Sequence, residues 1–204
     1  MVGPTGCGKS SLALQLASIC NQPVYRMNLH GDVRAADFLG DKTVSVDPAS
    51  GQSIISYKYG VLPNAMKEGA WLILDELDAA SAHILFTLQA VMESGMTLNL
   101  SSNYGEIIKA HDNFQIIATA NTLGQGDDTG LYAGTNQLNE AFMDRFGVVI
   151  RRSYAQPDVE AKILHEKTGL NLQDCKEMVK IANEVRQAQT RSEVYSTFGT
   201  RRLL

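Results

Sequence analysis

The chain begins with the stretch MVGPTGCGKSSLALQLA, residues 1–17, in which residues 3–10 read G-x-x-x-x-G-K-S. Glycines in this pattern allow backbone N–H groups to converge on phosphate oxygens, and a helix that follows directs its partial positive charge to the same place. The pattern therefore predicts a nucleotide phosphate site. The alternative is a glycine-rich turn that happens to precede a helix.

The predicted phosphate site implies a nucleotide and Mg²⁺ as its cofactors. In such loops the lysine, here Lys9, reaches the β- and γ-phosphates, and the serine, here Ser10, ligates Mg²⁺. Asp75 is the second expected Mg²⁺ ligand. The residues predicted to surround the nucleotide are Gly3, Pro4, Thr5, Gly6, Cys7, Gly8, Lys9, Ser10, Ser11 and Asp75.

Asp75 and Glu76 lie in the stretch WLILDELD, where an apolar segment ends in two carboxylates. In α/β folds ligands bind at the carboxyl ends of parallel strands, so both side chains are expected at the ligand edge of the sheet. Asp75 suits Mg²⁺ coordination, and Glu76 suits activation of the water that attacks the γ-phosphate. A solvated acidic turn is the alternative interpretation.

Three further residues are candidates for contact with the nucleotide. Asn121 ends the apolar segment IIATANT and is placed to hold the attacking water or the γ-phosphate. Arg145, in NEAFMDRF, is expected at a subunit edge, where an arginine can contact a neighbouring subunit's γ-phosphate. The pair at 151–152 competes for that role. Arg201, in FGTRRLL, is the remaining candidate, with the adjacent Arg202 as its rival.

The length and composition of the chain restrict its class. Its 204 residues suffice for one domain with a small appendage, and the net charge of −4 argues against a dedicated nucleic-acid binder. The three cysteines have no metal-ligand spacing, which favours reduced thiols and a cytoplasmic location. No apolar run is long enough for a membrane span, so no membrane partner is expected.

Apolar segments alternate with helical patterns along the first 150 residues. Strands are predicted at 23–29, 70–76, 114–120 and 147–151, and the second of them is apolar on both faces, as buried parallel strands are. This alternation predicts an α/β fold, a three-layer P-loop sandwich around a parallel sheet.

The remaining patterns are helical. Leu12, Leu16 and Ile19 recur at helical spacing and predict a helix directly after the phosphate loop. The C-terminal quarter of the chain is helical throughout, so we expect two domains. Residues 1–154 form the nucleotide-binding α/β domain, and residues 155–204 form a small helical lid.

Two β-hairpins are predicted between these elements, at about 42–59 and 96–110. The first has the turn sequence DPASG between its strands. Charges of both signs occur in the hairpins, which makes a poor surface for gripping DNA. These charged residues are Lys42, Asp47, Lys58, Glu106, Lys109 and Asp112.

In order and spacing, these motifs resemble those of an AAA+ ATPase: Walker A, Walker B, sensor 1, arginine finger and sensor 2. The two hairpins resemble the helix-2 and pre-sensor-1 insertions of the MoxR branch. Residues 118–146, ATANTLGQGDDTGLYAGTNQLNEAFMDRF, are similar to the ATPase subunit of aerobic cobaltochelatase and to activators of carbon-fixation and nitric-oxide-reducing enzymes.

The resemblance implies a role for each matching residue and a partner for the chain. It implies a homo-oligomeric ring, expected to be a hexamer, that remodels a client protein with a partner bearing a von Willebrand type A domain. The implied roles are phosphate loop for Gly3–Ser10, Walker B for Asp75 and Glu76, sensor 1 for Asn121, finger for Arg145 and sensor 2 for Arg201.

The resemblance also bears on the two residues ahead of the phosphate loop. The AAA+ body has five parallel strands with the phosphate-loop strand in the centre, so Met1 and Val2 are expected to end such a strand and the chain to be a fragment of a longer protein. Two other functions stay open at this point. One is a small-molecule P-loop kinase, and the other is a nucleic-acid motor.

Overall fold

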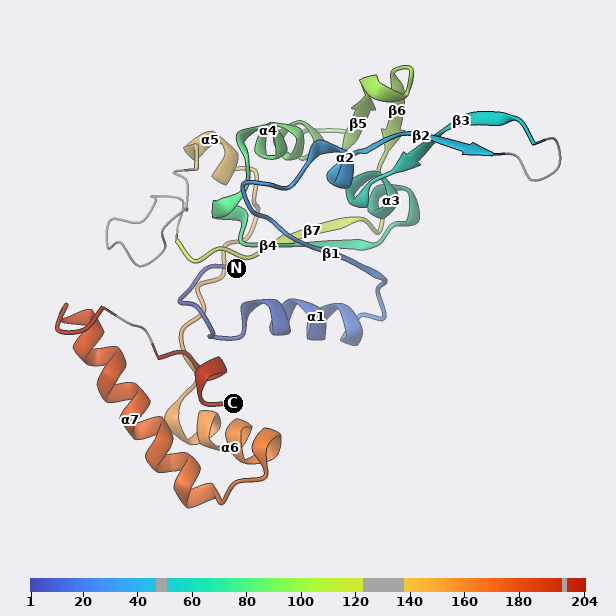
Figure 1. Ribbon diagram of the computed structural model, residues 1–204. Helices are drawn as coiled ribbons and strands as arrows, with labels where there is room; N and C mark the ends of the chain where they lie inside the picture. The colour runs from blue at the N-terminus through green and yellow to red at the C-terminus, as the bar shows by residue number, and fades with distance from the viewer. Residues whose placement is uncertain (47–50, 123–137, 196–197) are drawn as a thin grey trace.

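The structure of the chain is a computed structural model (Figure 1), and it describes residues 1–46, 51–122, 138–195 and 198–204. Most of the predicted DPASG turn, including Asp47, lies outside these residues. So does nearly all of the Gly/Asp-rich loop that follows Asn121.

A three-stranded parallel sheet forms the centre of the body, in the order β1–β4–β7. Its strands are β1 (Val24–Asn28), β4 (Trp71–Asp75) and β7 (Gln115–Ala118). In β4 the side chains of residues 72–74 are fully buried, as expected for a central strand covered on both faces. The buried strand predicted at 70–76 is therefore confirmed.

Helices cover both faces of this sheet (Figure 1). Helix α1 (Lys9–Ile19) lies on one face, and α3 (Val61–Glu68) and α4 (Ala82–Val91) lie on the other. The short α2 (Ala35–Phe38) precedes the first hairpin, and the 3-10 turn Leu77–Ala79 follows β4. The predicted three-layer α/β sandwich is confirmed.

Helix α1 follows the phosphate loop as predicted, but it does not bury the leucine stripe. Ala13 and Ala17 are fully buried, whereas Leu16 is 37% exposed and Ile19 is 81% exposed. Small side chains on the inner face allow a helix to pack closely against a sheet. Helical spacing predicted the helix but not the face that it turns inward.

Met1 and Val2 occupy an interior position beside the parallel sheet. The N–H of Val2 donates to the carbonyl of Ile150 (2.8 Å), and its own carbonyl accepts from the N–H of Arg152 (2.7 Å). On the other side, the N–H of Ala120 donates to the carbonyl of Met1 (3.0 Å). Met1 and Val2 therefore lie between the end of β7 and residues 150–152. The central position predicted for the strand before the phosphate loop is thus wrong, because β4 is the central strand of the β1–β4–β7 sheet.

The strand predicted at 147–151 is wrong in extent. Only an isolated parallel bridge forms there, between Arg151 and Val2. Val148, Val149 and Ile150 are 75%, 48% and 45% exposed. A ladder needs consecutive partners, and among the described residues only Met1 and Val2 lie alongside this segment.

Both predicted hairpins form. The first pairs β2 (Gly40–Val46) with β3 (Ser53–Tyr59), and the second pairs β5 (Thr97–Leu100) with β6 (Glu106–Lys109) through the 3-10 turn Ser101–Asn103. The first hairpin projects away from the body (Figure 1).

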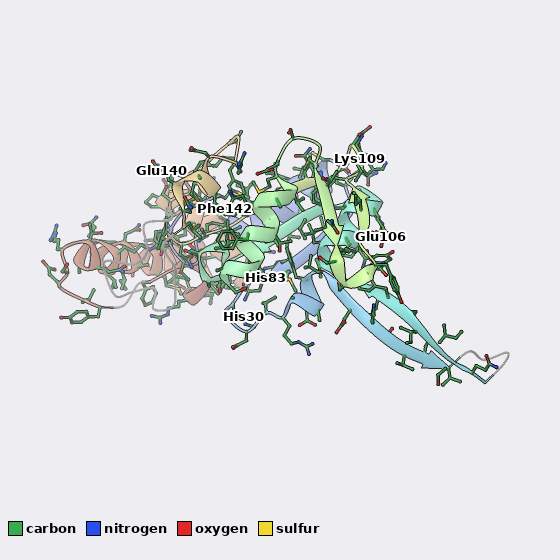
Figure 2. All side chains as sticks on the ribbon, turned by 90° about the horizontal axis from the view of Figure 1, so that it is seen from above. His30, His83, Glu106, Lys109, Glu140 and Phe142 are labelled. Atoms are coloured by element: carbon green, nitrogen blue, oxygen red, sulfur yellow. The ribbon has the colours of Figure 1, made fainter. Side chains whose placement is uncertain are left out.

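One carboxylate joins the base of the first hairpin to the turn end of the second. Glu106 accepts hydrogen bonds from the hydroxyl of Tyr59 (2.8 Å), the ammonium of Lys67 (2.9 Å) and the amide of Asn103 (2.6 Å). The Lys67 ammonium also lies 3.6 Å from the centre of the Tyr59 ring. Figure 2 shows Glu106 on the hairpin beside the start of the projecting one.

The C-terminal part is helical. After α5 (Glu140–Met143) come α6 (Pro157–Thr168), α7 (Leu172–Thr190) and the 3-10 turn Thr200–Arg202. Helices α6 and α7 pack on each other around a small apolar cluster of their own, apart from the larger cluster of the body. No helix among the described residues has both the length and the apolar character that crossing a bilayer requires.

Candidate functional site: a cleft at the phosphate loop

A cleft of about 260 Å³ opens where the strands of the parallel sheet end. The phosphate loop forms one wall, and the ends of β1, β4 and β7 form the other. Arg201, from the C-terminal turn, also lines it. The carboxyl edge of a parallel sheet is where α/β folds bind ligands.

The phosphate loop ends in a helix whose first N–H groups are left for an anion. Gly8 precedes α1 with a left-handed backbone (φ 87°), and no side chain caps the helix or places a carboxylate in its first turn. Gly3 is required for another reason, because a Cβ there would lie 1.9 Å from the carbonyl oxygen of Arg152. The start of α1 can thus bind a phosphate through its backbone, and Gly3 allows residue 152 to pack against the loop.

The side chain of Lys9 is buried and turned back onto the loop. Its ammonium donates to the carbonyls of Gly3 (2.7 Å) and Pro4 (3.1 Å) and to the side-chain oxygen of Asn121 (3.0 Å). Burial lowers the pKa of this ammonium. A phosphate in the cleft would supply the negative charge that these neutral acceptors lack.

Asp75 is nearly buried and makes three short contacts. One carboxylate oxygen accepts from the hydroxyls of Ser10 (2.5 Å) and Thr119 (2.8 Å), and the other accepts from Nε of Arg26 (2.6 Å). Burial alone would raise the pKa of the Asp75 carboxyl, but the hydrogen bonds from Ser10, Arg26 and Thr119 outweigh it and lower that pKa. The group is therefore a carboxylate at neutral pH.

The donor set at this contact fits Mg²⁺. A serine hydroxyl and an aspartate carboxylate are hard oxygen ligands, which Mg²⁺ prefers, and it usually combines one or two such ligands with phosphate oxygens and water. Ser10 and Asp75 would hold the ion beside the phosphates.

Glu76 follows Asp75 and lines the same cleft. Its backbone is left-handed (φ 58°, ψ 47°), a region that a non-glycine residue rarely occupies. Such conformations persist where the surrounding structure enforces them, often at functional sites. The structure thus brings the second carboxylate of the WLILDELD motif to the phosphate loop.

Asp78 is a residue that the sequence analysis missed. It is fully buried, and one of its carboxylate oxygens accepts from the backbone N–H groups of Asn121 (2.9 Å) and Thr122 (3.0 Å) and from the Thr122 hydroxyl (3.1 Å). These bonds fix the turn after β7 and so place the Asn121 side chain beside Lys9. The spacing of Asp78 from Asp75 is a signal that could have identified it.

Comparison with protein-family models agrees with this geometry. Residues 1–146 match the model of an AAA domain of the dynein-related subfamily. The chain belongs to the AAA family. Residues 160–204 match the C-terminal domain of the CbbQ/NirQ/NorQ proteins. The resemblance to a MoxR-type AAA+ ATPase, drawn from the motifs, is confirmed.

Two curated relatives extend the comparison. The aerobic cobaltochelatase subunit CobS of Sinorhizobium sp. is 34% identical over 207 residues, covering 99% of this chain and 61% of the relative. An uncharacterized protein of Staphylococcus aureus is 35% identical over 180 residues, covering 88% of this chain and 63% of the relative. The chain therefore spans about three fifths of the length of these relatives.

A solved structure supports the fold. A candidate ATPase of Cytophaga hutchinsonii aligns with a TM-score of 0.60 at 19% identity, over 89% of this chain and 52% of that protein. At that identity the match shows the AAA fold alone.

The structure does not bring together the arginines predicted to act on ATP. Arg201 lines the cleft of its own chain. Arg145 does not; it follows α5 and pairs with Glu93 at 3.3 Å. Of the rivals for the finger role, Arg152 donates through Nε to the Cys7 carbonyl of the phosphate loop (3.4 Å).

Proposed function

We propose that this AAA domain binds and hydrolyses Mg-ATP, with the chemistry in the cleft at the phosphate loop. The main support for the proposal is the hydrogen bond between Ser10 and Asp75, because it joins the phosphate loop to the C-terminal end of β4. Lys9 and Asn121 meet beside it. A P-loop ATPase needs these groups around one triphosphate.

Each residue of the cleft has a separate role in this proposal. Lys9 releases the loop carbonyls and binds the β- and γ-phosphates, while Ser10 and Asp75 hold Mg²⁺. The ion neutralises charge on the phosphates when it is bound. Glu76 accepts a proton from the attacking water, and Asn121 orients that water or the γ-phosphate.

We propose further that the protein works as a ring of six subunits, with Arg145 acting on the ATP of a neighbour. The position of Arg145 outside the cleft of its own chain supports this. In the same proposal, residues 1–154 are the motor body and residues 155–204 are a lid that moves with the nucleotide.

The proposed client is another protein, in the cytoplasm, engaged together with a partner that carries a von Willebrand type A domain. The named cobaltochelatase relative supports a chelatase-like task. Val44, Val46 and Ile55 on the projecting hairpin are 72%, 63% and 67% exposed. Exposed apolar side chains at a projecting site favour contact with a protein.

ATP turnover measured against protein concentration tests the proposal. Turnover per subunit should rise with concentration, because the finger comes from a neighbour. Lys9→Ala should abolish ATP binding, with Lys180→Ala on α7 as the matched surface control. Turnover independent of concentration that requires an added acceptor would indicate a kinase, and stimulation by DNA would indicate a nucleic-acid motor.

A further inference from the structure

The lid contains a buried ion pair that the sequence patterns did not suggest. Glu160 on α6 is fully buried, and Arg186 on α7 is 8% exposed. The guanidinium donates to both carboxylate oxygens, at 2.7 and 2.8 Å. Burying two charges is costly, and replacing such a pair by apolar residues is often neutral or stabilising. Fold stability alone therefore does not explain why Glu160 and Arg186 occupy this position.

The ion pair holds the C-terminal segment on both sides of Gly199. The hydroxyl of Thr200 donates to Glu160 (2.6 Å), and Nε of Arg186 donates to the carbonyl of Phe198 (2.7 Å). Thr200 directly precedes the arginine that lines the cleft. Figure 1 shows this segment between the lid helices and the body.

The same segment touches the phosphate loop. Gly199 lies so close to it that an added Cβ would be 2.7 Å from the carbonyl oxygen of Thr5. That carbonyl accepts from the hydroxyl of Tyr154 (3.0 Å), and the Tyr154 ring lies 3.8 Å from the Arg186 guanidinium. A continuous set of contacts thus runs from the phosphate loop through the ion pair to residues 199–201.

We propose that the Glu160–Arg186 pair is a positioning unit that sets Arg201 in the ATP cleft and ties the lid to the phosphate loop. Through it, Arg201 distinguishes ATP from ADP by its contact with the γ-phosphate. The inference rests on the proposed ATPase function and adds the residues that align the lid with the nucleotide.

Thr200→Val tests the proposal with little risk to folding. It removes one hydroxyl, while Glu160 keeps both bonds from Arg186. Calorimetric titrations with Mg-ADP and with a non-hydrolysable Mg-ATP analogue should show an affinity for the analogue that is lower by about tenfold and an unchanged affinity for ADP. Thr200→Ser keeps the hydroxyl and should restore wild-type values.

A double-mutant comparison separates positioning from simple stability. Arg201→Ala alone should lower the affinity for the analogue by a similar factor, and Thr200→Val should add nothing in that background. An equal loss for both nucleotides, or losses that add, would show a merely structural role and overturn the proposal. A wild-type protein that binds neither nucleotide would instead refute the proposed function.

Tyr154→Phe provides a second test should Thr200→Val fail to fold. It deletes the hydroxyl that bonds Thr5 and leaves the ring on Arg186. The preference for the ATP analogue over ADP should fall several-fold. An unchanged preference would overturn the tie between lid and phosphate loop.

Discussion

Two arginines that the motifs predict to contact a nucleotide lie in opposite settings. Arg201 lines the cleft beside the phosphate loop of its own chain, in a segment that is bonded to Glu160 on α6. Arg145 lies outside that cleft, 38% exposed, and pairs with Glu93, which is 56% exposed. The difference teaches that residues of one chain surround the cleft, while the arginine proposed to act on a neighbouring subunit lies on another surface.

The energetics of the two settings differ in the same way. Contacts around Asp75 are short and nearly buried, so removing one of their members leaves a polar group poorly satisfied. An exposed pair such as Arg145–Glu93 contributes about 0–1 kcal/mol. Arg145 can leave Glu93 at little cost, whereas the cleft must keep its geometry.

Arg145→Ala should have the largest effect on turnover. Loss of a trans-acting finger lowers ATP hydrolysis by about 10³- to 10⁵-fold. ATP affinity should stay nearly unchanged, because Arg145 does not line its own cleft. Steady-state turnover and equilibrium ATP binding measure the two quantities, with the exposed Arg191→Ala as the control. A matching loss of binding would break the contrast between the two arginines.

Glu76→Gln should come next, with hydrolysis reduced by about 10²- to 10⁴-fold and ATP binding retained. The control is Glu177→Gln, on the exposed face of α7. Mixing Glu76→Gln with Arg145→Ala subunits sharpens the comparison. Mixed rings contain interfaces with an intact Glu76 and an intact Arg145, so activity should partly return, and no recovery would contradict a finger acting between subunits.

Arg26→Gln should have a moderate effect, seen mainly in acid. The pKa of Asp75 is lowered in the folded protein, so its ionised form stabilises the fold above the ordinary pKa of 3.8, and this contribution is lost as the pH falls through the folded pKa. Removing Arg26 should raise that pKa and move acid unfolding to higher pH. Because Arg26 is half exposed, the cost should be about 1 kcal/mol or less. Circular dichroism can follow unfolding between pH 2 and 6, roughly the range over which carboxylates titrate.

An acid-unfolding profile identical to that of the wild type would show that Arg26 does not lower the pKa of Asp75.

Glu93→Gln should have the smallest effect. It removes the resting partner of Arg145, and the free energy of unfolding should change by less than about 1 kcal/mol. Turnover in the assembled protein should stay at the wild-type level. Thermal melting and an ATPase assay are sufficient, and a large loss of stability would mean that the Arg145 surface is as rigid as the cleft.

The motifs predicted the part of the site whose chemistry depends on local spacing. The phosphate loop, the Asp75–Glu76 pair and Asn121 were predicted at the ends of their elements, and the structure brings all three to one cleft. Glycine spacing and apolar strands ending in polar residues are local signals. The same local signals predict the fold class, because each depends on residues close together in the sequence.

Local sequence patterns could not predict contacts between segments that are distant in the sequence. Arg26 pairs with Asp75, 49 residues away, and Glu160 pairs with Arg186 on a face that helical periodicity would reserve for apolar residues. The strand expected at 147–151 depended on the length of its neighbour, and the inner face of α1 depended on how closely the helix approaches the sheet. Tertiary packing decides such features.

The carboxylate of Glu106 joins both hairpins to α3, since it binds Tyr59 from one hairpin and Lys67 from that helix. Helix α3 ends just before β4, whose far end carries Asp75. Under the proposed function, a displacement of either hairpin would be passed to the other and, through α3, to the strand that ends in Asp75, the proposed Mg²⁺ ligand. Strand β4 would then couple movement of the hairpins to ATP hydrolysis.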